Sequence, residues 1–425
     1  MKTKVKKMSY EEVLAIKVAP HKRPLKISMF FRVLLKVLSR VVLTTMGFEV
    51  NKINMDKLDK KEPCLVLMNH SSFADMEIVA DLMFPRPFNI VTTTDGFVGL
   101  NPLMRLIGCI PTKKFVTDLV LVRDMAYTVK ELKSSVVLFP EASYSFDGTA
   151  TTLPESLGKC LKMLKVPVVM IHTYGAFSRQ PLYNGLRKRK VKVTADMEYI
   201  LSPEDIVEKS VDELNEILAQ QFSFDNFRWQ QENKVSIPNE DRADDLNRVL
   251  YKCPHCLTEG KMVGKGIAVT CEQCGKAYEL TEFGALCAVE GEGKFNHIPD
   301  WYRWERECVR QELLDGTYKL DVAVDICMMV DTKCVYQVGE GRLVHDTSGF
   351  RLTGCDGKLD YHQKPQASYS LYSDYYWYEL GDMVCIGNMD VLYYCFPKEG
   401  GDVVAKTRLA AEELYKLVKN GELKG

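Results

Sequence analysis

Short apolar runs alternate with helix-like stretches through the first half of the chain. Four runs have the length of buried strands: residues 64–68, 89–92, 135–139 and 166–171. Apolar residues three and four positions apart predict helices between them, up to residue 83 and over residues 118–133 and 153–164. Strands that alternate with helices predict an α/β layer fold, which ends near Phe222.

The second half of the chain has a different pattern. Residues 223–250 are polar and acidic, which predicts a linker between domains. A helical pattern over residues 301–314 and another over 403–419 enclose short alternating segments separated by Gly and Asp. These segments predict strands over residues 318–324, 334–338 and 368–380. Residues 284–425 therefore predict a small β-rich domain with a C-terminal helix.

A basic amphipathic helix is predicted near the start, over residues 27–48. Its charged side chains, Arg32, Lys36 and Arg40, are four residues apart and share one helical face. Residues 1–50 carry a net charge of +8, so the rest of the chain carries −9. A wide apolar face beside a narrow basic one predicts a helix that associates with a membrane surface. The alternative is a helix packed on its own domain with its cations solvated.

Composition limits the class of protein. The 425 residues suffice for two to three domains, and 46% hydrophobic and 27% charged residues with a net charge of −1 exclude a disordered chain and a dedicated basic nucleic-acid binder. The 14 cysteines would suit a secreted protein, but residues 1–26 lack the apolar core of a signal peptide, so we expect a reducing cytoplasm. No apolar run reaches the roughly 18 residues that a membrane-spanning helix needs.

The first apolar run leads into Asn69 and His70, and Asp75 follows within the start of a predicted helix. At such a strand-to-helix turn, the Asp75 carboxylate can reach back to the His70 ring, fix its tautomer and stabilise the imidazolium. The pair predicts a general base without a Ser or Cys nucleophile of its own. The alternative is a chance spacing, because acidic residues are favoured near helix N-termini.

Three further segments follow this pair in a set order. Residues 108–114 (GCIPTKK) form a predicted turn with two cations, residues 139–141 (FPE) end a strand, and residues 166–169 (VPVV) open another. Together with NHSSFAD at residues 69–75, they resemble the four blocks of the glycerolipid (lysophospholipid) acyltransferase family: NHxxxxD, a Gly-to-Arg block, FPEGTR and a VP block. The resemblance covers residues 48–222. It implies an α/β acyltransferase domain, with a mixed sheet flanked by helices, over residues 51–222.

The resemblance also implies roles for individual residues. His70 would deprotonate the glycerol hydroxyl of the acceptor, which attacks the thioester of an acyl-coenzyme A or acyl-carrier-protein donor, and Asp75 would orient His70. Lys114 stands where the family has a phosphate-binding Arg. The implied substrate-binding residues are Asn69, Lys113, Lys114, Glu141 and Ser143.

The third block departs from the family's pattern. Ala142, Ser143 and Tyr144 replace Gly-Thr-Arg, so a second phosphate-binding cation is missing, although Arg179 could supply charge from elsewhere. We expect transfer of a fatty acyl group to 1-acyl-sn-glycerol-3-phosphate, which gives phosphatidic acid in phospholipid biosynthesis. The alternatives are a zwitterionic lysophospholipid or another alcohol as acceptor, and a lipid-binding or regulatory protein without turnover.

Two CxxC pairs predict a metal site: Cys253 with Cys256, and Cys271 with Cys274. Four thiolates from two tight turns match structural, tetrahedral Zn²⁺, with an iron–sulfur cluster as the lesser alternative. Residues 251–283 accordingly resemble a zinc ribbon. The ribbon lacks a basic stripe, so we expect no nucleic-acid binding. A rival hypothesis makes the ribbon and the last domain the functional part of the chain.

Residues 315–420 are distantly similar to pleckstrin-homology-like domains. An aromatic cluster within them is expected to pack in a core rather than to contact a membrane: Tyr369, Tyr372, Tyr375, Tyr376, Trp377 and Tyr378. The complete prediction is an enzyme peripherally associated with the cytoplasmic, inner face of a membrane. Its expected partners are a lysophospholipid, an acyl donor and the membrane surface.

Overall fold

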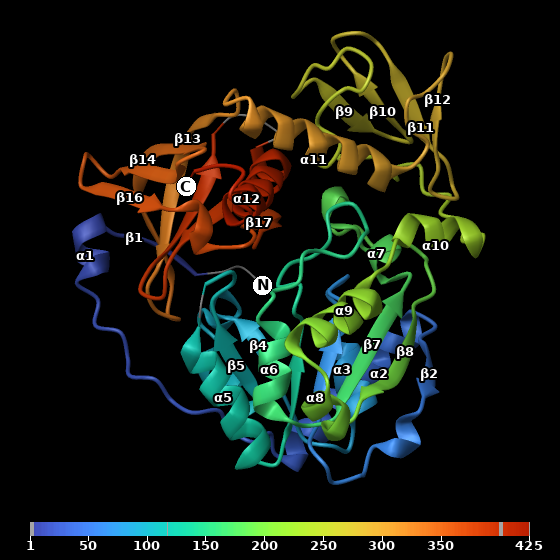
Figure 1. Ribbon diagram of the computed structural model, residues 1–425, viewed down its shortest axis with the longest axis vertical. Coiled ribbons are helices and arrows are strands. Elements are labelled where there is room, and N and C mark those ends of the chain that lie inside the picture. Colours follow the sequence, from blue (N-terminus) through green and yellow to red (C-terminus); the bar gives the residue numbers. More distant parts are fainter. Residues whose placement is uncertain (1–3, 117, 399–402, 425) are drawn as a thin grey trace.

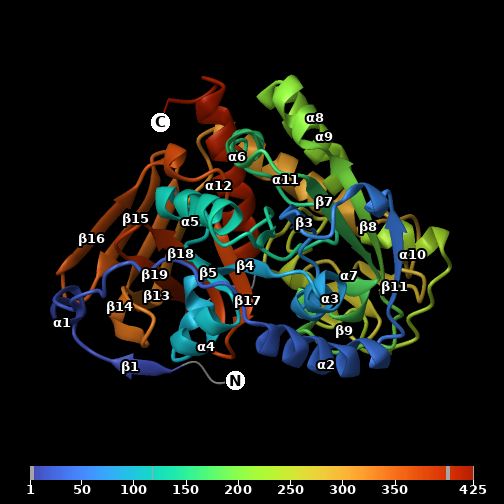
Figure 2. The same ribbon diagram turned by 90° about the horizontal axis from the view of Figure 1, so that it is seen from below.

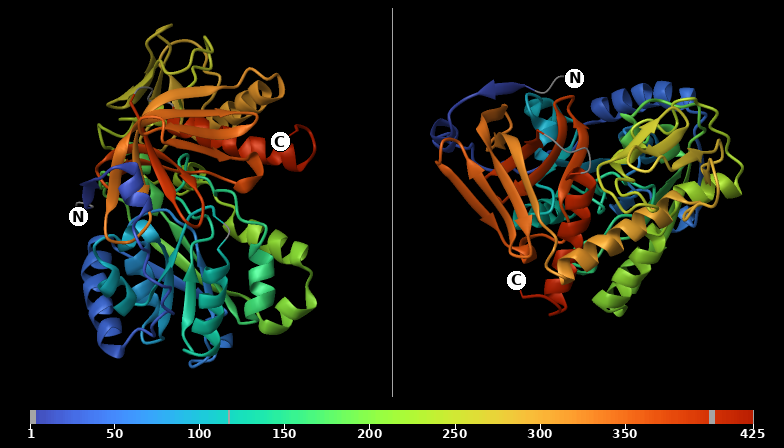
Figure 3. Two further views of the ribbon diagram at one scale, coloured as in Figure 1. Left: turned by 90° about the vertical axis from the view of Figure 1, so that its left-hand side faces the viewer. Right: turned by 90° about the horizontal axis from the view of Figure 1, so that it is seen from above.

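The computed structural model describes residues 4–116, 118–398 and 403–424. They form an α/β domain, a four-stranded ribbon and a larger β-rich domain (Figure 1). The β-rich domain rests on the α/β domain, as the left view of Figure 3 shows. No described helix combines the length and the apolar character needed to cross a membrane.

A seven-stranded mixed sheet, of order β2-β8-β7-β3-β6-β4-β5, forms the α/β domain and confirms the predicted fold. Strands β7 and β8 pair antiparallel, whereas the other neighbours pair in parallel. The carboxyl ends of β3, β6, β4 and β5 therefore lie along one edge. The strands are β2 (Glu49–Ile53), β3 (Leu65–Met68), β4 (Phe88–Thr93), β5 (Cys109–Thr112), β6 (Ser135–Leu138), β7 (Val168–Tyr174) and β8 (Thr194–Leu201).

Helices cover both faces of this sheet. The alternating side chains of β3 illustrate the two cores, since Val66 and Met68 pack with α3 whereas Leu65 and Leu67 pack with α5, α6 and α9. The helices of this region are α2 (Met29–Thr45), α3 (Asp75–Met83), α4 (Asn101–Leu106), α5 (Leu119–Lys130), α6 (Leu157–Leu164), α7 (Ala176–Arg179), α8 (Pro203–Glu208), α9 (Val211–Phe222) and α10 (Asn226–Glu232).

Strand β5 lies where the sequence favoured a turn. Among the described residues it pairs along one side only, with β4, and Pro111 is opposite Thr92. Proline has no N–H for a second neighbour, so an edge strand tolerates it while its presence hides the strand in the sequence. The predicted strands at residues 64–68, 89–92 and 135–139 correspond to β3, β4 and β6.

Helix α2 turns its basic side toward the domain. Lys36 Nζ lies 2.7 Å from one Asp81 carboxylate oxygen and Arg40 Nη1 lies 3.4 Å from the other. The opposite side exposes a continuous apolar face: Met29, Phe30, Val33, Leu34, Val37, Leu38, Val41 and Val42. The alternative stated from the sequence was a helix packed on its own domain with solvated cations. The expectation of a solvated cation is wrong for Lys36, whose side chain is only 28% exposed.

The segment predicted as a linker is packed. Residues 226–232 form α10, and the next residues place Ala243, Leu246, Val249 and Leu250 in one core with the ribbon. Their apolar side chains are scattered among acidic residues without a helix or strand period, so the pattern looked like an exposed connection.

The ribbon and the β-rich domain complete the chain. The ribbon consists of β9 (Met262–Lys265), β10 (Ala268–Cys271), β11 (Ala277–Leu280) and β12 (Leu286–Ala288). Helix α11 (Ile298–Leu314) then leads to β13 (Leu320–Met329), β14 (Val335–Asp346), β15 (Gly349–Gly354), β16 (Leu359–Gln363), β17 (Tyr372–Trp377), β18 (Gly381–Gly387), β19 (Leu392–Pro397) and α12 (Val403–Lys419). This arrangement confirms the predicted β-rich domain with a C-terminal helix.

The start of the chain joins this last domain rather than the α/β domain. Strand β1 (Val5–Lys7) pairs in parallel with β14, and Val13 of α1 (Tyr10–Leu14) is buried in the β-rich core. Residues 1–50, treated as one segment in the sequence, therefore divide between two domains. A three-residue strand gives too short a pattern to reveal a partner so far along the chain.

Candidate functional site

His70 and Asp75 lie together at the carboxyl end of β3. The Asp75 Oδ2 atom is 2.8 Å from His70 Nδ1 and also accepts hydrogen bonds from the backbone N–H groups of Ser71 and Ser72, at 3.1 and 3.3 Å. Asp75 opens α3 and its side chain is only 4% exposed, so it is held rigidly. This contact fixes the imidazole with its proton on Nδ1 and leaves Nε2 free to accept a proton.

Glu141 ties the loop after β6 to the same place. Its carboxylate accepts hydrogen bonds from the backbone N–H of His70 at 2.9 Å and from that of Thr151 at 2.7 Å. Burial raises the pKa of Glu141 to about 7, although these two hydrogen bonds act in the opposite direction. Glu141 therefore positions the His70 backbone and does not line the cavity described below.

Two aromatic rings enclose the His70 imidazole. Tyr144 stacks on it with ring centroids 4.0 Å apart, and Phe139 lies at 4.7 Å. Tyr144 occupies the third-block position where the family pattern has Arg, so an aromatic surface here replaces a cation. The rings restrict the orientation of the imidazole, whose side chain is 19% exposed and lines the cavity described below.

The Asn69 side chain is bonded to a neighbouring strand, and the Ser143 side chain is buried. The Asn69 side chain accepts a hydrogen bond from Thr173 N–H at 2.8 Å and donates one to Thr173 C=O at 3.2 Å, which joins the end of β3 to β7. Ser143 is buried, and its hydroxyl has no hydrogen-bond partner in the described part of the chain. Neither side chain lines the cavity.

A cavity of about 1900 Å³ lies over the carboxyl edge of the sheet. His70, Asp75, Lys113 and Lys114 line it, so the structure brings the predicted base and the predicted cations into one space. Lys114 follows β5, three strands from β3, which corresponds to about 14 Å along the edge. Arg179 is not among the lining residues, and its guanidinium donates to the backbone carbonyls of residues 189 and 191.

The two lysines have different surroundings. The Lys113 ammonium donates to the backbone carbonyl of Met389, whereas the Lys114 ammonium lies 4.1 Å from the centroid of the Tyr372 ring. Burial lowers the pKa of both side chains, and nearby acidic groups oppose that shift. Both contacts are with the β-rich domain.

Side chains of α5, β6 and α6 form an apolar part of the cavity lining. Its lining side chains are aliphatic or sulfur-containing: Leu121, Val122, Met125, Leu138, Cys160 and Met163. Such a surface can hold a hydrocarbon chain, because burying each CH₂ group contributes about 0.8 kcal/mol.

The β-rich domain forms the facing wall, which the sequence did not reveal. Tyr372 OH and Trp377 Nε1 both donate to Asp95 Oδ2, at 2.5 and 3.2 Å, and thereby dock β17 against the α/β domain. Tyr372 and Trp377 are buried, as expected for core aromatics, but they also line the cavity. The clustering of Tyr and Trp was the available signal, and nothing in it indicated contact with a different domain.

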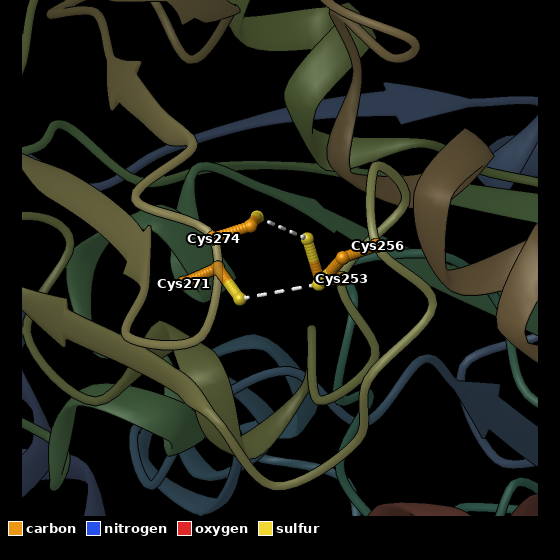
Figure 4. Close-up of side chains that lie close together, drawn as sticks. All are labelled: Cys253, Cys256, Cys271 and Cys274. Carbon is orange, nitrogen blue, oxygen red and sulfur yellow. Dashed lines mark hydrogen bonds between the residues drawn. The ribbon is translucent and has the colours of Figure 1, made fainter.

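The four cysteines of the ribbon converge (Figure 4). The Sγ atoms of Cys253 and Cys274 are 3.7 Å apart, as are those of Cys256 and Cys271, and all four lie within 4.8 Å of one another. Bonds of about 2.3 Å in a tetrahedral Zn²⁺ site would separate the sulfurs by about 3.8 Å. The cysteines are therefore close enough to bind a metal ion, and the donor set fits Zn²⁺ without an open position.

Part of the chain is similar to known proteins. None of the curated proteins matches the chain. Among solved structures, the crystal structure of the 1-acyl-sn-glycerophosphate (LPA) acyltransferase PlsC from Thermotoga maritima is similar, with 16% sequence identity and a TM-score of 0.37 over 45% of this chain and 76% of that chain. The family model described as Acyltransferase matches residues 49–172, which include His70, Asp75 and Glu141. The chain therefore contains an acyltransferase domain.

Proposed function

We propose that the protein transfers a fatty acyl group from acyl-coenzyme A or acyl carrier protein to a lysophospholipid hydroxyl. The observation that carries the proposal is the His70–Asp75 pair at a cavity with a partly apolar lining, within the acyltransferase domain. The pair supplies a base for the hydroxyl, and the apolar part of the lining suits the acyl chain.

In the proposed reaction, His70 Nε2 removes the proton from the acceptor hydroxyl as its oxygen attacks the thioester carbonyl. Asp75 stabilises the imidazolium that results. The C–S bond then breaks, the sulfur leaves as a thiolate, and the imidazolium returns the proton to it. The products are the ester and the free thiol of the donor, so no other reactant is needed.

The proposed acceptor class is a lysophospholipid, with 1-acyl-sn-glycerol-3-phosphate as the first substrate to test. Lys113 and Lys114 are cations at the cavity that could bind its phosphate. Asn69, Glu141 and Ser143 remain proposed contributors to substrate binding, for which Asn69 and Glu141 would act by positioning the backbone beside His70.

The decisive experiment measures transfer from labelled acyl-coenzyme A and acyl carrier protein to a panel of lysophospholipids on liposomes. We expect wild-type protein to form a diacyl product and His70→Ala to form none above background. Liposome binding without transfer to any acceptor would instead support the rival of a lipid-binding protein without turnover.

We also propose that α2 lies on the inner, cytoplasmic surface of a membrane. Its apolar face includes Phe30 and Val37, 69% and 58% exposed, while Lys36 is turned toward Asp81 of the domain. Leu103 and Leu106 of α4 are also exposed, and α4 lies along the same edge of the molecule as α2 (Figure 2). Burying this surface in lipid would remove these apolar side chains from water.

Flotation with anionic vesicles tests the membrane proposal. The double variant Phe30→Asp, Val37→Asp should lose most vesicle binding without a change in melting temperature, because both side chains are already solvated. A matched double variant on the surface of the ribbon, Val263→Asp, Val289→Asp, should bind as wild type. Equal binding by all three proteins would exclude α2 as the membrane contact.

For the cysteine cluster we propose structural Zn²⁺ within a zinc ribbon over residues 251–283. The metal would link the two CxxC turns and contribute folding free energy to a small sheet. Elemental analysis should find about one zinc per chain in wild type and none in Cys271→Ser. Iron in place of zinc would favour the iron–sulfur alternative.

A further inference from the structure

The strand β17 and the turn after it contain polar side chains of two kinds. Four are anchored within the protein, since Tyr372 and Trp377 donate to Asp95, Tyr375 donates to the Arg248 carbonyl at 2.6 Å, and Tyr376 donates to Asp245 at 2.8 Å. In the part of the chain that the structure describes, the side chains of Asp374 and Tyr378 make no hydrogen bond to another side chain. Both line the cavity that contains His70.

The backbone of this turn is strained. Tyr376, Tyr378 and Glu379 have φ angles of 54°, 45° and 63°, in the left-handed region that non-glycine residues seldom adopt. The pairing of β17 with β18 also shifts register between Asp374 and Trp377. Irregularities of this kind redirect side chains and are concentrated at functional sites, because surrounding contacts must maintain them.

External contacts maintain this conformation. The Asp382 carboxylate accepts a hydrogen bond from the Tyr376 backbone N–H at 3.1 Å and holds Arg248 through both of its oxygens. The Arg248 guanidinium also lies 4.1 Å from the centroid of the Tyr376 ring. The backbone of the turn and the Tyr376 side chain are thus fixed before any ligand binds, which lowers the entropic cost of binding.

Two opposite charges meet at this wall. The Lys114 ammonium lies over Tyr372, and Asp374 is two positions further along β17, so its side chain shares the face of the strand with Tyr372. The described part of the chain gives neither charge an ion pair within 4.0 Å. Burial raises the pKa of Asp374 to about 7, although Lys114 acts in the opposite direction.

The chemistry of the ligand follows from this pair. A phosphate group suits Lys114, but a lone phosphate monoester would also face the Asp374 carboxylate. Tyr144 stands where the family has Arg, and the ammonium of Lys113, the neighbouring cation, already donates to the Met389 carbonyl. An ammonium group on the same ligand would satisfy Asp374, and the rings of Tyr144 and Tyr378 offer surfaces that attract cations.

We propose that Asp374 and Lys114, from two different domains, bind a zwitterionic head group of the acyl acceptor, with the ammonium at Asp374 and the phosphate at Lys114. This inference rests on the proposed acyl transfer and makes Asp374 a specificity-determining residue. It also gives the β-rich domain a direct part in choosing the substrate.

Full-length protein tests the proposal by acyl transfer to lysophosphatidylethanolamine and to lysophosphatidic acid. Wild type should prefer the first. Asp374→Asn should lower kcat/KM for lysophosphatidylethanolamine by about 10- to 100-fold, as expected for a lost charge-assisted contact, and change the value for lysophosphatidic acid less than about threefold. Lys114→Met should lower both values. The control is Asp325→Asn, a half-exposed carboxylate of the same domain paired with Lys398.

Other outcomes overturn the proposal. A wild-type preference for lysophosphatidic acid, equal losses with both acceptors in Asp374→Asn, or an effect confined to the KM of the acyl donor would each contradict it. Melting curves show whether the variants are folded, and Asp374→Glu, which keeps the charge, should retain more activity than Asn.

A binding measurement separates this proposal from the proposed function. If wild type transfers to neither acceptor, acyl transfer fails as the function. Titration of lysophosphatidylethanolamine into His70→Ala, with and without Asp374→Asn, then decides the head-group site alone. Binding that does not depend on Asp374 would overturn it.

Discussion

The two walls of the cavity are built in different ways. On one wall, His70 and Asp75 are five residues apart, and a single turn from β3 into α3 is enough to bring them together. On the other, Tyr372 reaches an acceptor on Asp95 that is 277 residues away in the sequence. The comparison teaches that the proposed chemistry is encoded locally, whereas the shape and charge of the cavity depend on the assembly of two domains.

The largest expected effect is on the first wall. His70→Ala should lower kcat by about 10³-fold, because a positioned general base contributes about 10² to 10⁴. Asp75→Asn should cause a similar loss, since an amide cannot stabilise the imidazolium. Initial rates at saturating substrate measure both. His362→Ala is the control, with a side chain 62% exposed on the β-rich domain. Substantial turnover in His70→Ala would remove the local pair from the chemistry.

Much of this first wall could be predicted from the sequence. The strand, the turn and the start of the helix follow one another within residues 65–75, so their spacing predicts their geometry. Glu141 was identified by its position in a motif, but its contact with the His70 backbone was not. That contact depends on β3 and β6 being neighbours, which no local pattern specifies.

A second prediction concerns Glu141, whose contact with His70 in the first wall depends on the packing of β6 beside β3. Glu141→Gln should lower kcat by about 10-fold, because the neutral amide cannot accept both backbone hydrogen bonds. Burial raises the pKa of Glu141 from 4.5 to about 7, so the folded state binds the proton more tightly than the unfolded state. The stability linked to this proton is present below pH 4.5 and is lost as the pH rises toward 7.

Urea unfolding across that interval measures this linkage. The free energy of unfolding should fall less with rising pH in Glu141→Gln than in wild type, because the variant lacks the titrating group. Glu208→Gln, at an exposed position of α8, should keep the wild-type pH dependence. Parallel curves for all three proteins would show that Glu141 does not titrate as described.

The smallest effect is expected on the second wall. Tyr372→Phe removes a hydroxyl that donates to Asp95 and accepts from Trp377 Nε1 at 2.9 Å. Trp377 Nε1 still donates to Asp95 in this variant, but the two hydrogen bonds of the hydroxyl are lost. Their loss should lower the free energy of unfolding by about 1–3 kcal/mol, and the KM for the acceptor should rise several-fold with little change in kcat. Tyr361→Phe in the same domain is the control. An unchanged KM together with unchanged stability would show that docking by Tyr372 does not shape the cavity.

The second wall of the cavity and helix α2 show why other features of the structure could not be predicted from the sequence. The aromatic residues of β17 look like ordinary core positions, and their burial is real, but the sequence does not say which domain they face. For α2, the periodicity separated Lys36 and Arg40 from the apolar side correctly. Which side turns inward depends on the acidic Asp81 of α3, a partner outside the periodic segment.

The pairing of Val5 with Val335 has a consequence for synthesis on the ribosome. Strand β1 is translated before the acyltransferase domain, but its partner emerges more than three hundred residues later, which at about 5–20 residues per second is a delay of about 15 to 65 seconds. The acyltransferase domain can therefore fold while β1 remains an unpaired leader. We expect the pairing of β1 with β14, in the sheet of the β-rich domain, to form in one of the last steps of co-translational folding.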